Sequence, residues 1–328
     1  MGEITGKRVL LTGGAGFIGS HLARALQAEN EVYVVDNLYR HGGRPEWLDS
    51  CRNVRFLESD VRDLAAIRSF LPSDITHVVD LAAVAGVLTV VRDPVEAMRS
   101  NLEGSLSVIA LAEALPQLEH FVYFSSSEVY GPVAGGVAED DVRLQLRLEE
   151  PRWTYAVSKL AAEVLLFQLW RERRFPVTIV RPFNVYGPGQ LGESAVHAFA
   201  REALAGRPLQ VRGSGAQRRA WCYVDDFLAG LLLILARRPL GRVFNLGNPS
   251  AVCDVRELAE AVRTAAGSRS PIETAPLPCE DVEERVPDIA RAAALGFLPQ
   301  VGLAEGLART VAWYRSRAHA PAQVQTAG

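Results

Sequence analysis

Short apolar runs recur through the first half of the chain, and longer segments with helical periodicity separate most of them. The runs occupy residues 8–12, 32–36, 54–58, 78–81, 121–125 and 177–181. Nearly continuous apolar runs are typical of strands buried on both faces, and the longer segments between them are typical of helices that cover a sheet. This alternation predicts an α/β fold with a doubly wound parallel sheet.

The pattern changes beyond Pro182, where glycine and proline become more frequent and the expected elements become shorter. A further strand-like run at residues 242–246 returns the chain to the main sheet, so we expect two lobes that interleave in sequence. The small, polar residues at the C-terminal end predict a flexible tail. The predicted units are a main domain of residues 1–182 joined by about 221–249, a smaller C-terminal lobe of residues 183–220 and 250–317, and a tail of residues 318–328.

The composition supports a large folded unit and favours no highly charged partner. A chain of 328 residues with 48% apolar residues can bury a sizeable core. The net charge of -3 and the pI of about 6.1 create no overall field that would attract nucleic acid or an anionic membrane. The longest apolar run, near residues 228–236, is too short to span a bilayer. We therefore expect neither nucleic acid nor a membrane as a partner.

The four cysteines, Cys51, Cys222, Cys253 and Cys279, are far apart and form no Cys-x-x-Cys pair or Cys/His cluster. This spacing indicates neither a zinc site nor a disulfide framework, so we expect no metal and a reducing cytoplasm. The chain reaches an apolar run by residue 9 without the charged and apolar regions of a signal peptide, which also favours a cytoplasmic protein.

A glycine loop follows the first apolar run and begins a helical segment. Its glycines, Gly13, Gly16 and Gly19, suit a tight turn, a close approach of the backbone to a pyrophosphate, and the packing of a helix on a sheet. Asp36 ends the next apolar run, about twenty residues further on, where an acidic side chain accepts hydrogen bonds from the adenosine ribose. A carboxylate there would repel a 2′-phosphate, so the pattern predicts a dinucleotide site for NAD rather than NADP.

Tyr155 and Lys159 have the spacing that places two side chains on one face of a helix. An ammonium group beside a phenol stabilises the phenolate and lowers its pKa, which is ordinarily about 10. The run at 121–124 is followed by Ser125 to Ser127 and by Glu128, so hydroxyls and a carboxylate are expected at the sheet edge where α/β proteins bind ligands. Beside a redox cofactor, this set predicts the oxidation of a hydroxyl group, with Tyr155 as the base.

Four motifs together resemble the extended short-chain dehydrogenase/reductase family of nucleotide-sugar enzymes. They are TGGAGFIG at 12–19, YAVSK at 155–159, RPFNVYGPG at 181–189 and RVPDI at 285–289, and the resemblance runs from about residue 7 to 315. It implies a Rossmann-type domain with a smaller substrate-binding lobe. It also implies that Tyr155 is the base at the sugar O4, that Lys159 binds the nicotinamide ribose and tunes the tyrosine, and that the Ser126 hydroxyl assists.

The resemblance extends to residues that would bind the cofactor and the substrate. Asn184 and Arg285 resemble the family's ligands for the nucleotide-sugar phosphates, and an arginine fork suits two phosphates. Besides Gly13, Gly16, Gly19, Asp36, Tyr155 and Lys159, the residues expected to bind the cofactor are Phe17, Ile18, Asn37, Asp60, Val61, Leu81, Ala82, Ala83, Asn101 and Ser125.

The run Ser126-Ser127-Glu128 resembles the Thr-Ser-Glu run of UDP-glucuronate decarboxylases, with serine in place of threonine at the first position. Family members that only epimerise at C4 usually have a small neutral residue at the position of Glu128. In 4,6-dehydratases an Asp-Glu pair stands here, and Ser127 cannot act as the carboxylic acid of that pair. Arg219, within the segment 217–221, resembles the decarboxylase arginine that lies near the sugar carboxylate.

These residues imply a reaction in which oxidation at C4 serves a second event at C5. A 4-keto sugar with a C6 carboxylate is a β-keto acid, which loses carbon dioxide without a metal. Ser127, Glu128 and Arg219 are the candidates for holding a water or the proton donor at C5. The expected product is a UDP-4-keto-pentose, UDP-xylose or both. The alternatives are a 4-epimerase of UDP-glucuronate or a UDP-hexose, an NDP-sugar 4,6-dehydratase, and an NAD-sensing regulator without catalysis.

A helix predicted over residues 154–170 is apolar on nearly every side, and a predicted helix over 102–115 has a similar excess of apolar residues. The sheet can cover only part of these surfaces. We therefore expect a homodimer in which the two helices of each subunit form a four-helix bundle, as in relatives of the family.

Overall fold

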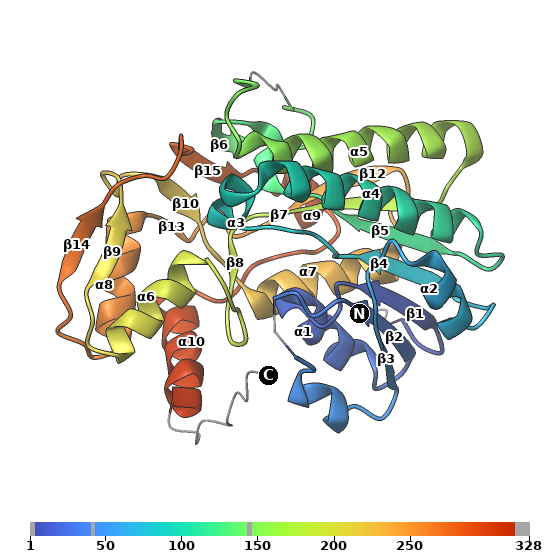
Figure 1. Cartoon of the computed structure of the whole chain (residues 1–328), viewed down its shortest axis with the longest axis horizontal. Coiled ribbons are helices and arrows are strands. Elements are labelled where there is room, and N and C mark those ends of the chain that lie inside the picture. The colour runs from blue at the N-terminus through green and yellow to red at the C-terminus, as the bar shows by residue number, and fades with distance from the viewer. Residues whose placement is uncertain (1–3, 41–42, 143–145, 319–328) are drawn as a thin grey trace.

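The computed structural model describes residues 4–40, 43–142 and 146–318 (Figure 1). Residues 319–328, which make up nearly all of the predicted tail, lie outside the described part of the chain. Ala318 is the last residue of a helix.

A seven-stranded parallel sheet forms the centre of the larger lobe, with the strand order β12-β7-β5-β4-β1-β2-β3. Its strands are β1 (Arg8–Thr12), β2 (Glu31–Asp36), β3 (Val54–Glu58), β4 (His77–Asp80), β5 (His120–Phe124), β7 (Val177–Pro182) and β12 (Arg242–Leu246). The order reverses direction at β1, as in a doubly wound sheet. The predicted α/β fold with a parallel sheet is therefore confirmed.

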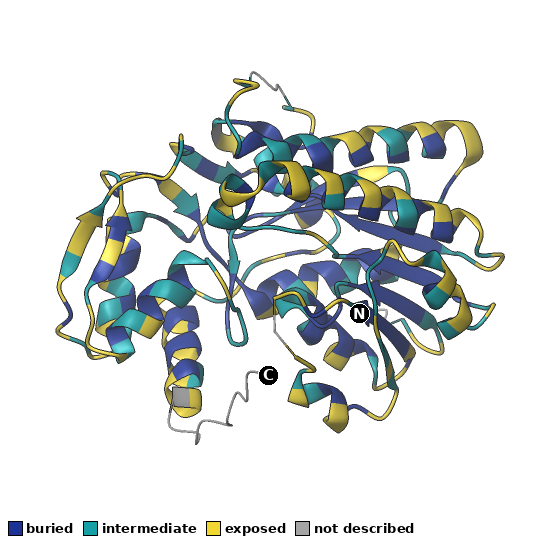
Figure 2. Ribbon diagram, viewed as in Figure 1, coloured by how far each residue is buried: buried dark blue, intermediate teal, exposed yellow. Residues whose placement is uncertain are grey.

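Helices cover both faces of this sheet, which explains why its strands are apolar throughout (Figures 1 and 2). One face packs against α1 (Phe17–Leu26) and α7 (Val224–Arg237). The opposite face packs against α2 (Leu64–Phe70), α4 (Pro94–Glu113) and α5 (Trp153–Arg173). The central strands are consequently buried almost completely, and their carboxyl ends are fixed in position.

Two helix boundaries differ from the predicted ones because capping residues set them. Helix α4 begins eight residues before the predicted start at 102, since Asp93 accepts a hydrogen bond from the Glu96 backbone N–H and Pro94 occupies the first turn. Helix α5 continues to Arg173 and ends at Arg174, which adopts a left-handed conformation.

The smaller lobe contains two further sheets, β13-β10-β15-β6 and β14-β9, and the helices α6, α8 and α10 (Figure 1). Its elements are α6 (Ala195–Leu204), β9 (Leu209–Arg212), β10 (Arg218–Ala220), β13 (Val252–Asp254), α8 (Val255–Ala265), β14 (Ile272–Ala275), β15 (Glu284–Pro287) and α10 (Leu303–Ala318). Strand β6 (Val133–Val137) comes from the range predicted for the main domain, yet it pairs with β15. The pattern missed this strand because two glycines interrupt it.

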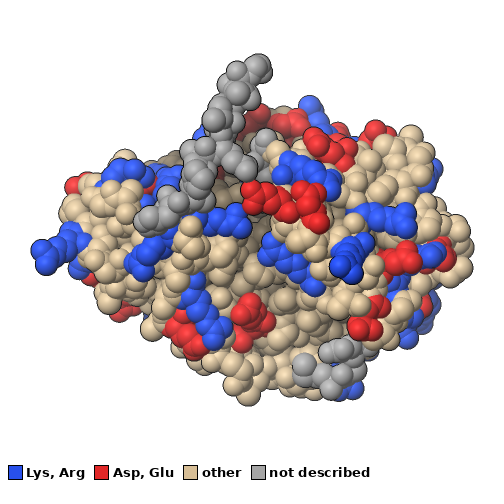
Figure 3. Space-filling view, turned by 90° about the horizontal axis from the view of Figure 1, so that it is seen from below, with Lys and Arg blue, Asp and Glu red and all other residues tan. Residues whose placement is uncertain are grey.

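Short elements complete the described chain. They are α3 (Val87–Arg92), α9 (Ala290–Ala293), the strand pair β8 (Val185–Tyr186) and β11 (Cys222–Tyr223), and the 3₁₀ helices η1 (Glu46–Ser50) and η2 (Ser127–Tyr130). Acidic and basic side chains are interspersed on the face drawn in Figure 3. Among the described helices, none combines the length and the apolar character that crossing a membrane requires.

Candidate active site

A cleft of about 670 Å³ lies at the carboxyl ends of the main-sheet strands. Every residue predicted to bind the cofactor lines this cleft, although these residues come from many separate segments. They are Gly13, Gly16, Phe17, Ile18, Gly19, Asp36, Asn37, Asp60, Val61, Leu81, Ala82, Ala83, Asn101, Ser125, Tyr155 and Lys159. The fold therefore brings the whole predicted set to one edge of the sheet.

Two glycines of the loop allow close approaches of the backbone. Gly13 has a positive φ of 64°, and a Cβ atom there would lie 2.8 Å from the Ala82 backbone. A Cβ atom on Gly19 would lie 2.6 Å from the Cα atom of Gly14. A side chain at either position would push the loop away from its neighbours.

The residues present fit a dinucleotide at this loop. Gly16 is the N-cap of α1, and neither a capping side chain nor an acidic residue in the first turn satisfies the helix N-terminus. The free N–H groups and the positive end of the helix dipole therefore suit a diphosphate. The Ser125 hydroxyl, also in the cleft, is buried without a hydrogen-bond partner among the described residues.

Asp36 lies at the end of β2, with its carboxylate held at the cleft by backbone N–H groups. Oδ2 accepts a hydrogen bond from Ala15 at 3.1 Å, and Oδ1 accepts one from Leu38 at 2.8 Å. Each carboxylate oxygen has a further lone pair. The carboxylate can therefore accept hydrogen bonds from ribose hydroxyls without losing its backbone contacts.

Replacing Asp36 by alanine is expected to weaken NAD binding about ten- to a hundredfold, because a charge-assisted hydrogen bond contributes about 1.5–3 kcal/mol. Discrimination against NADP should weaken as well, because the repulsive carboxylate is gone. Calorimetric titration with both dinucleotides measures the change. Asp49→Ala, at an exposed position outside the cleft, is the control. Unchanged NAD affinity in Asp36→Ala would exclude this role.

Tyr155, Lys159 and Ser126 all line the cleft, as the sequence predicts. Tyr155 and Lys159 lie in the first turns of α5, and Tyr155 is hydrogen-bonded to Ser126. The Lys159 Nζ atom donates a hydrogen bond to the Phe124 carbonyl at 2.8 Å. It also lies 4.9 Å from the centre of the Tyr123 ring.

Burial dominates the acidity of both Tyr155 and Lys159, and the predicted effect of Lys159 on the tyrosine stays a prediction. Burial raises the pKa of Tyr155 to about 12, although the Ser126 hydrogen bond opposes the shift. The Lys159 ammonium group is directed to the Phe124 carbonyl. Burial also lowers the pKa of Lys159 to about 8, against the opposing charges of Asp80 and Glu163.

Glu128 lies in η2, directly after β5, and is held by two arginines. The Ser126 hydroxyl caps this short helix by accepting a hydrogen bond from the Glu128 backbone N–H at 3.1 Å. The Glu128 carboxylate pairs with Arg152 at 3.0 Å and with Arg285 at 3.5 Å. Ser127 is buried within the same turn.

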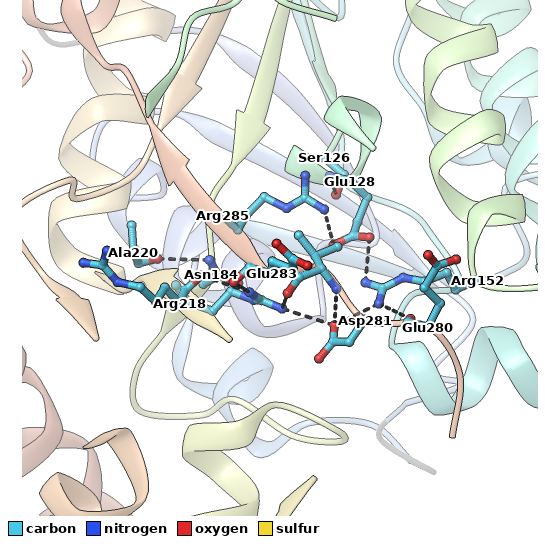
Figure 4. A network of polar contacts seen from close by, with 12 residues as sticks. Ser126, Glu128, Arg152, Asn184, Arg218, Ala220, Glu280, Asp281, Glu283 and Arg285 are labelled. Atoms are coloured by element: carbon cyan, nitrogen blue, oxygen red, sulfur yellow. Dashed lines mark hydrogen bonds and ion pairs between the residues drawn. The ribbon is translucent and has the colours of Figure 1, made fainter. Parts of the chain in front are cut away.

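These contacts belong to a larger group of charges, which we call the arginine cluster: Arg152, Arg219, Arg285, Glu128 and Asp281 (Figure 4). Asp281 accepts hydrogen bonds from Arg152 at 2.9 Å and from Arg219 at 3.1 Å. Three guanidinium groups thus face two carboxylates. The cluster has one positive charge that no carboxylate within it balances.

The arginines keep Glu128 ionised. Burial alone would raise the pKa of Glu128, but the charges of Arg285, Arg152 and Arg219 outweigh burial and lower it. A carboxylate that remains ionised at neutral pH cannot donate a proton. An ionised Glu128 would hold a water or the proton donor at C5, and this role stays a prediction.

The predicted substrate residues lie beside the cleft rather than in its lining. In the described chain, Glu128, Asn184, Arg219 and Arg285 are all absent from the cleft lining. Arg219 is turned into the protein, where it also donates to the Val282 carbonyl at 2.6 Å. Asn184 has a positive φ of 37° and donates to the Ala220 carbonyl at 3.0 Å.

Arg285 differs from Arg219 because it retains donor capacity. Its side chain is almost fully buried, at 1% exposure, and its Nε and Nη1 atoms have no partner among the described residues. Unpaired N–H groups on a buried guanidinium are costly. Arg285 is therefore suited to an anionic group of a ligand.

Sequence reasoning missed two members of the cluster, Arg152 and Asp281. Arg152 carried a usable signal, because a positive charge at the N-terminus of a helix opposes the helix dipole and so needs a partner. Asp281 carried no such signal. It lies in the loop between β14 and β15, and its arginine partners are far away in sequence.

The chain is similar to a known family and to proteins named as decarboxylases. Residues 9–247 match the model of the NAD dependent epimerase/dehydratase family. The chain is 32% identical over 321 residues to UDP-N-acetyl-alpha-D-glucosaminuronate decarboxylase of Bacillus cytotoxicus, covering 94% of this chain and 98% of that protein. It is 31% identical to UDP-glucuronic acid decarboxylase 1 of Danio rerio, covering 94% and 72%.

The fold is also similar to a solved enzyme. UDP-glucuronic acid 4-epimerase from Bacillus cereus, solved in complex with UDP-glucuronic acid and NAD, superposes with a TM-score of 0.84. The two chains are 26% identical, and the superposition covers 94% of this chain and 99% of the epimerase.

Proposed function

This chain belongs to the NAD-dependent epimerase/dehydratase family, and from that membership we propose that it is a UDP-glucuronate decarboxylase. The family predicted from the four sequence motifs is confirmed, and so are the enzymatic nature of the chain and NAD as its cofactor. The reaction itself is our proposal. It predicts loss of carbon dioxide after oxidation at C4, with a UDP-4-keto-pentose, UDP-xylose or both as the product.

The observation that carries this proposal is the unbalanced positive charge of the arginine cluster. Glu128 is two residues from Ser126, and its charge acts on Tyr155, so the cluster adjoins the proposed catalytic groups. A hexuronate brings one carboxylate, which would balance the cluster. The diphosphate of any UDP-sugar would also bring negative charge to Arg285, so the cluster supports an anionic nucleotide sugar and does not by itself select a hexuronate. The names of the decarboxylase relatives support the same substrate class.

The residues divide the proposed chemistry between two steps. NAD, when bound, accepts a hydride from C4 of the sugar. Tyr155 takes the O4 proton, and the hydroxyl of Ser126, which is hydrogen-bonded to Tyr155, assists it. Lys159 supplies a positive charge near the end of β5. Because burial raises the pKa of Tyr155, we expect the rate to rise with pH as more phenolate forms.

The second step takes place at C5 of the keto sugar. The C5–C6 bond breaks, carbon dioxide leaves, and the electron pair passes into the enolate of the C4 ketone. A proton then adds at C5. Since Glu128 is ionised, we propose that it holds and orients the water that delivers this proton. Ser127 and Arg219 remain proposed members of this group.

A second candidate is a 4-epimerase of UDP-glucuronate. The similarity to an epimerase solved with UDP-glucuronic acid and NAD favours it, because the same substrate and cofactor serve that reaction. The two reactions share the step at C4 and differ at C5. The arginine cluster therefore fits both reactions equally, and only the product distinguishes the two functions.

The deciding experiment incubates the purified protein with UDP-glucuronate and measures carbon dioxide and the products. We expect carbon dioxide and a UDP-pentose or UDP-4-keto-pentose. A product of unchanged mass with an inverted C4 centre would instead establish the epimerase. The 2-acetamido analogue of UDP-glucuronate is the second substrate to assay, because the Bacillus cytotoxicus relative is named for it.

We further propose that the enzyme is a homodimer built from α4 and α5, which lie side by side on the outer face of the sheet (Figure 1). Exposed apolar side chains support this proposal: Val95 and Leu106 on α4, Val164 on α5, and Leu148, at 94% exposure, just before α5. Light scattering at micromolar concentration tests it, and a monomer would contradict it.

We retain three further expectations as parts of the proposal. Residues 1–182 and about 221–249 would bind NAD, and the smaller lobe would bind the UDP-sugar. A reducing cytoplasm would suit Cys51, Cys222, Cys253 and Cys279, which are all free thiols.

A further inference from the structure

Asp80, the last residue of β4, carries a buried carboxylate and directly precedes Leu81, which lines the cleft. The residue is 1% exposed. Its Oδ1 atom accepts a hydrogen bond from the Thr12 hydroxyl at 2.6 Å, whereas Oδ2 has no partner within the described part of the chain. A buried carboxylate with one free oxygen needs a counter-charge if it is to stay ionised.

The ammonium group of Lys159 is on the same side of the main sheet as the Asp80 carboxylate. Asp80 is the register partner of both Thr12 on β1 and Tyr123 on β5, and side chains of partnered residues in parallel strands point to one face. Lys159 Nζ lies over the Tyr123 ring, so α5 brings it to that face. Burial raises the pKa of the Asp80 carboxyl and the Lys159 charge opposes that shift, so the two charges stabilise each other.

The other groups near Lys159 do not supply its counter-charge. Glu163, one turn further along α5, accepts hydrogen bonds from both Nε and Nη2 of Arg181 and is thereby neutralised. Tyr123 and Tyr155 carry neutral phenols, because burial raises the pKa of each. Of the described carboxylates whose charge acts on Lys159, Asp80 alone is not paired with an arginine.

We propose that Asp80 is a positioning residue whose carboxylate is the buried counter-ion that keeps the Lys159 ammonium group charged. The inference rests on the role proposed above for Lys159. Burial already lowers the pKa of Lys159 to about 8, and Asp80 is the largest influence that opposes this shift. Without the carboxylate, the amine would lose its proton at a lower pH.

The composition of the chain makes this charge directly measurable. Lys7 and Lys159 are the only two lysines in the sequence. Protein labelled with ¹³Cε-lysine therefore gives two lysine signals, whose chemical shifts report protonation. Lys7 is partly exposed and paired with Glu119. The Lys7→Arg variant keeps only the Lys159 signal, and this assigns both signals of the wild type.

The test compares the wild type with Asp80→Asn, which removes the charge but can still accept the Thr12 hydrogen bond. We expect the titration midpoint of Lys159 to fall by at least about one pH unit, which is tenfold in the proton affinity, while Lys7 does not move. Asp60→Asn is the matched control, because Asp60 lines the same cleft but pairs with Arg62. It should leave the Lys159 midpoint unchanged.

An unchanged Lys159 midpoint in Asp80→Asn would overturn the proposal. If that variant does not fold, the wild type decides the question: a Lys159 signal that is charged at neutral pH supports the proposal, and a neutral one overturns it. In turnover, loss of the Lys159 charge should limit the expected rise of the rate with pH, and in Asp80→Asn this limit should appear at a lower pH than in the wild type. Since the NMR titration needs no substrate, its failure is distinguishable from a wrong choice of reaction.

Discussion

Tyr155→Phe is expected to lower kcat with UDP-glucuronate by about 10²–10⁴-fold, the range typical for removal of a general base. The phenylalanine ring retains the packing of the half-buried side chain, so folding and NAD binding should change little. The loss should therefore appear in kcat rather than in KM. The measurements are steady-state kinetics and the NAD dissociation constant.

Tyr39→Phe is the matched control for this prediction. Tyr39 also lines the cleft but is 69% exposed, and it lacks a hydrogen bond to Ser126. Removal of the Tyr39 hydroxyl should leave kcat nearly unchanged. Undiminished turnover in Tyr155→Phe would mean that another group removes the O4 proton.

Arg152→Leu is expected to reduce the free energy of unfolding by about 3–5 kcal/mol at neutral pH, the usual effect of removing one partner from a buried ion pair. Arg152 is buried and donates to both carboxylates of the arginine cluster. Its loss leaves Glu128 and Asp281 with fewer positive charges. Urea unfolding of the wild type and the variant measures the difference.

The difference in unfolding free energy between the wild type and Arg152→Leu should become smaller as the pH falls. Arginines lower the pKa values of Glu128 and Asp281 in the folded protein, despite burial. The stabilisation from these two carboxylates is fully present above the pKa of about 4 that they have in the unfolded chain. It is lost as the pH falls through their lower pKa values in the folded protein. The effect of Arg152→Leu should therefore shrink in acid.

Arg147→Leu is the control for Arg152→Leu. The Arg147 side chain is 73% exposed, so its removal should change the free energy of unfolding by less than about 0.5 kcal/mol. A stability difference that stays constant between neutral and acid pH would show that Arg152 acts through packing instead of through its charge.

The cofactor half of the site could be predicted because its signals are local. The glycine loop and Asp36 are each next to a strand that the apolar pattern reveals. Once the strands are parallel, their carboxyl ends must meet at one edge, and this brings the remaining lining residues together.

The charged half of the site could be predicted only in part, because its contacts join distant segments. Glu128, Arg219 and Arg285 were found through a family resemblance, but their mutual pairing depends on how β6, β10 and β15 form one sheet. Nothing in the chain around Asp281 indicates that it joins two arginines. The raised pKa of Tyr155 was also inaccessible, since helical spacing gives a direction for the side chain but not its burial.

The cofactor cleft and the arginine cluster are completed at different times during synthesis of the chain. Every residue that lines the cleft lies at or before Leu191, whereas the arginine cluster needs Asp281 and Arg285. A ribosome synthesises the lining of the cofactor cleft first, and domains generally fold from the N-terminal end during synthesis. The guanidinium groups of Arg152 and Arg219 therefore emerge before Asp281, so the carboxylate that joins these two arginines is missing until translation is nearly complete.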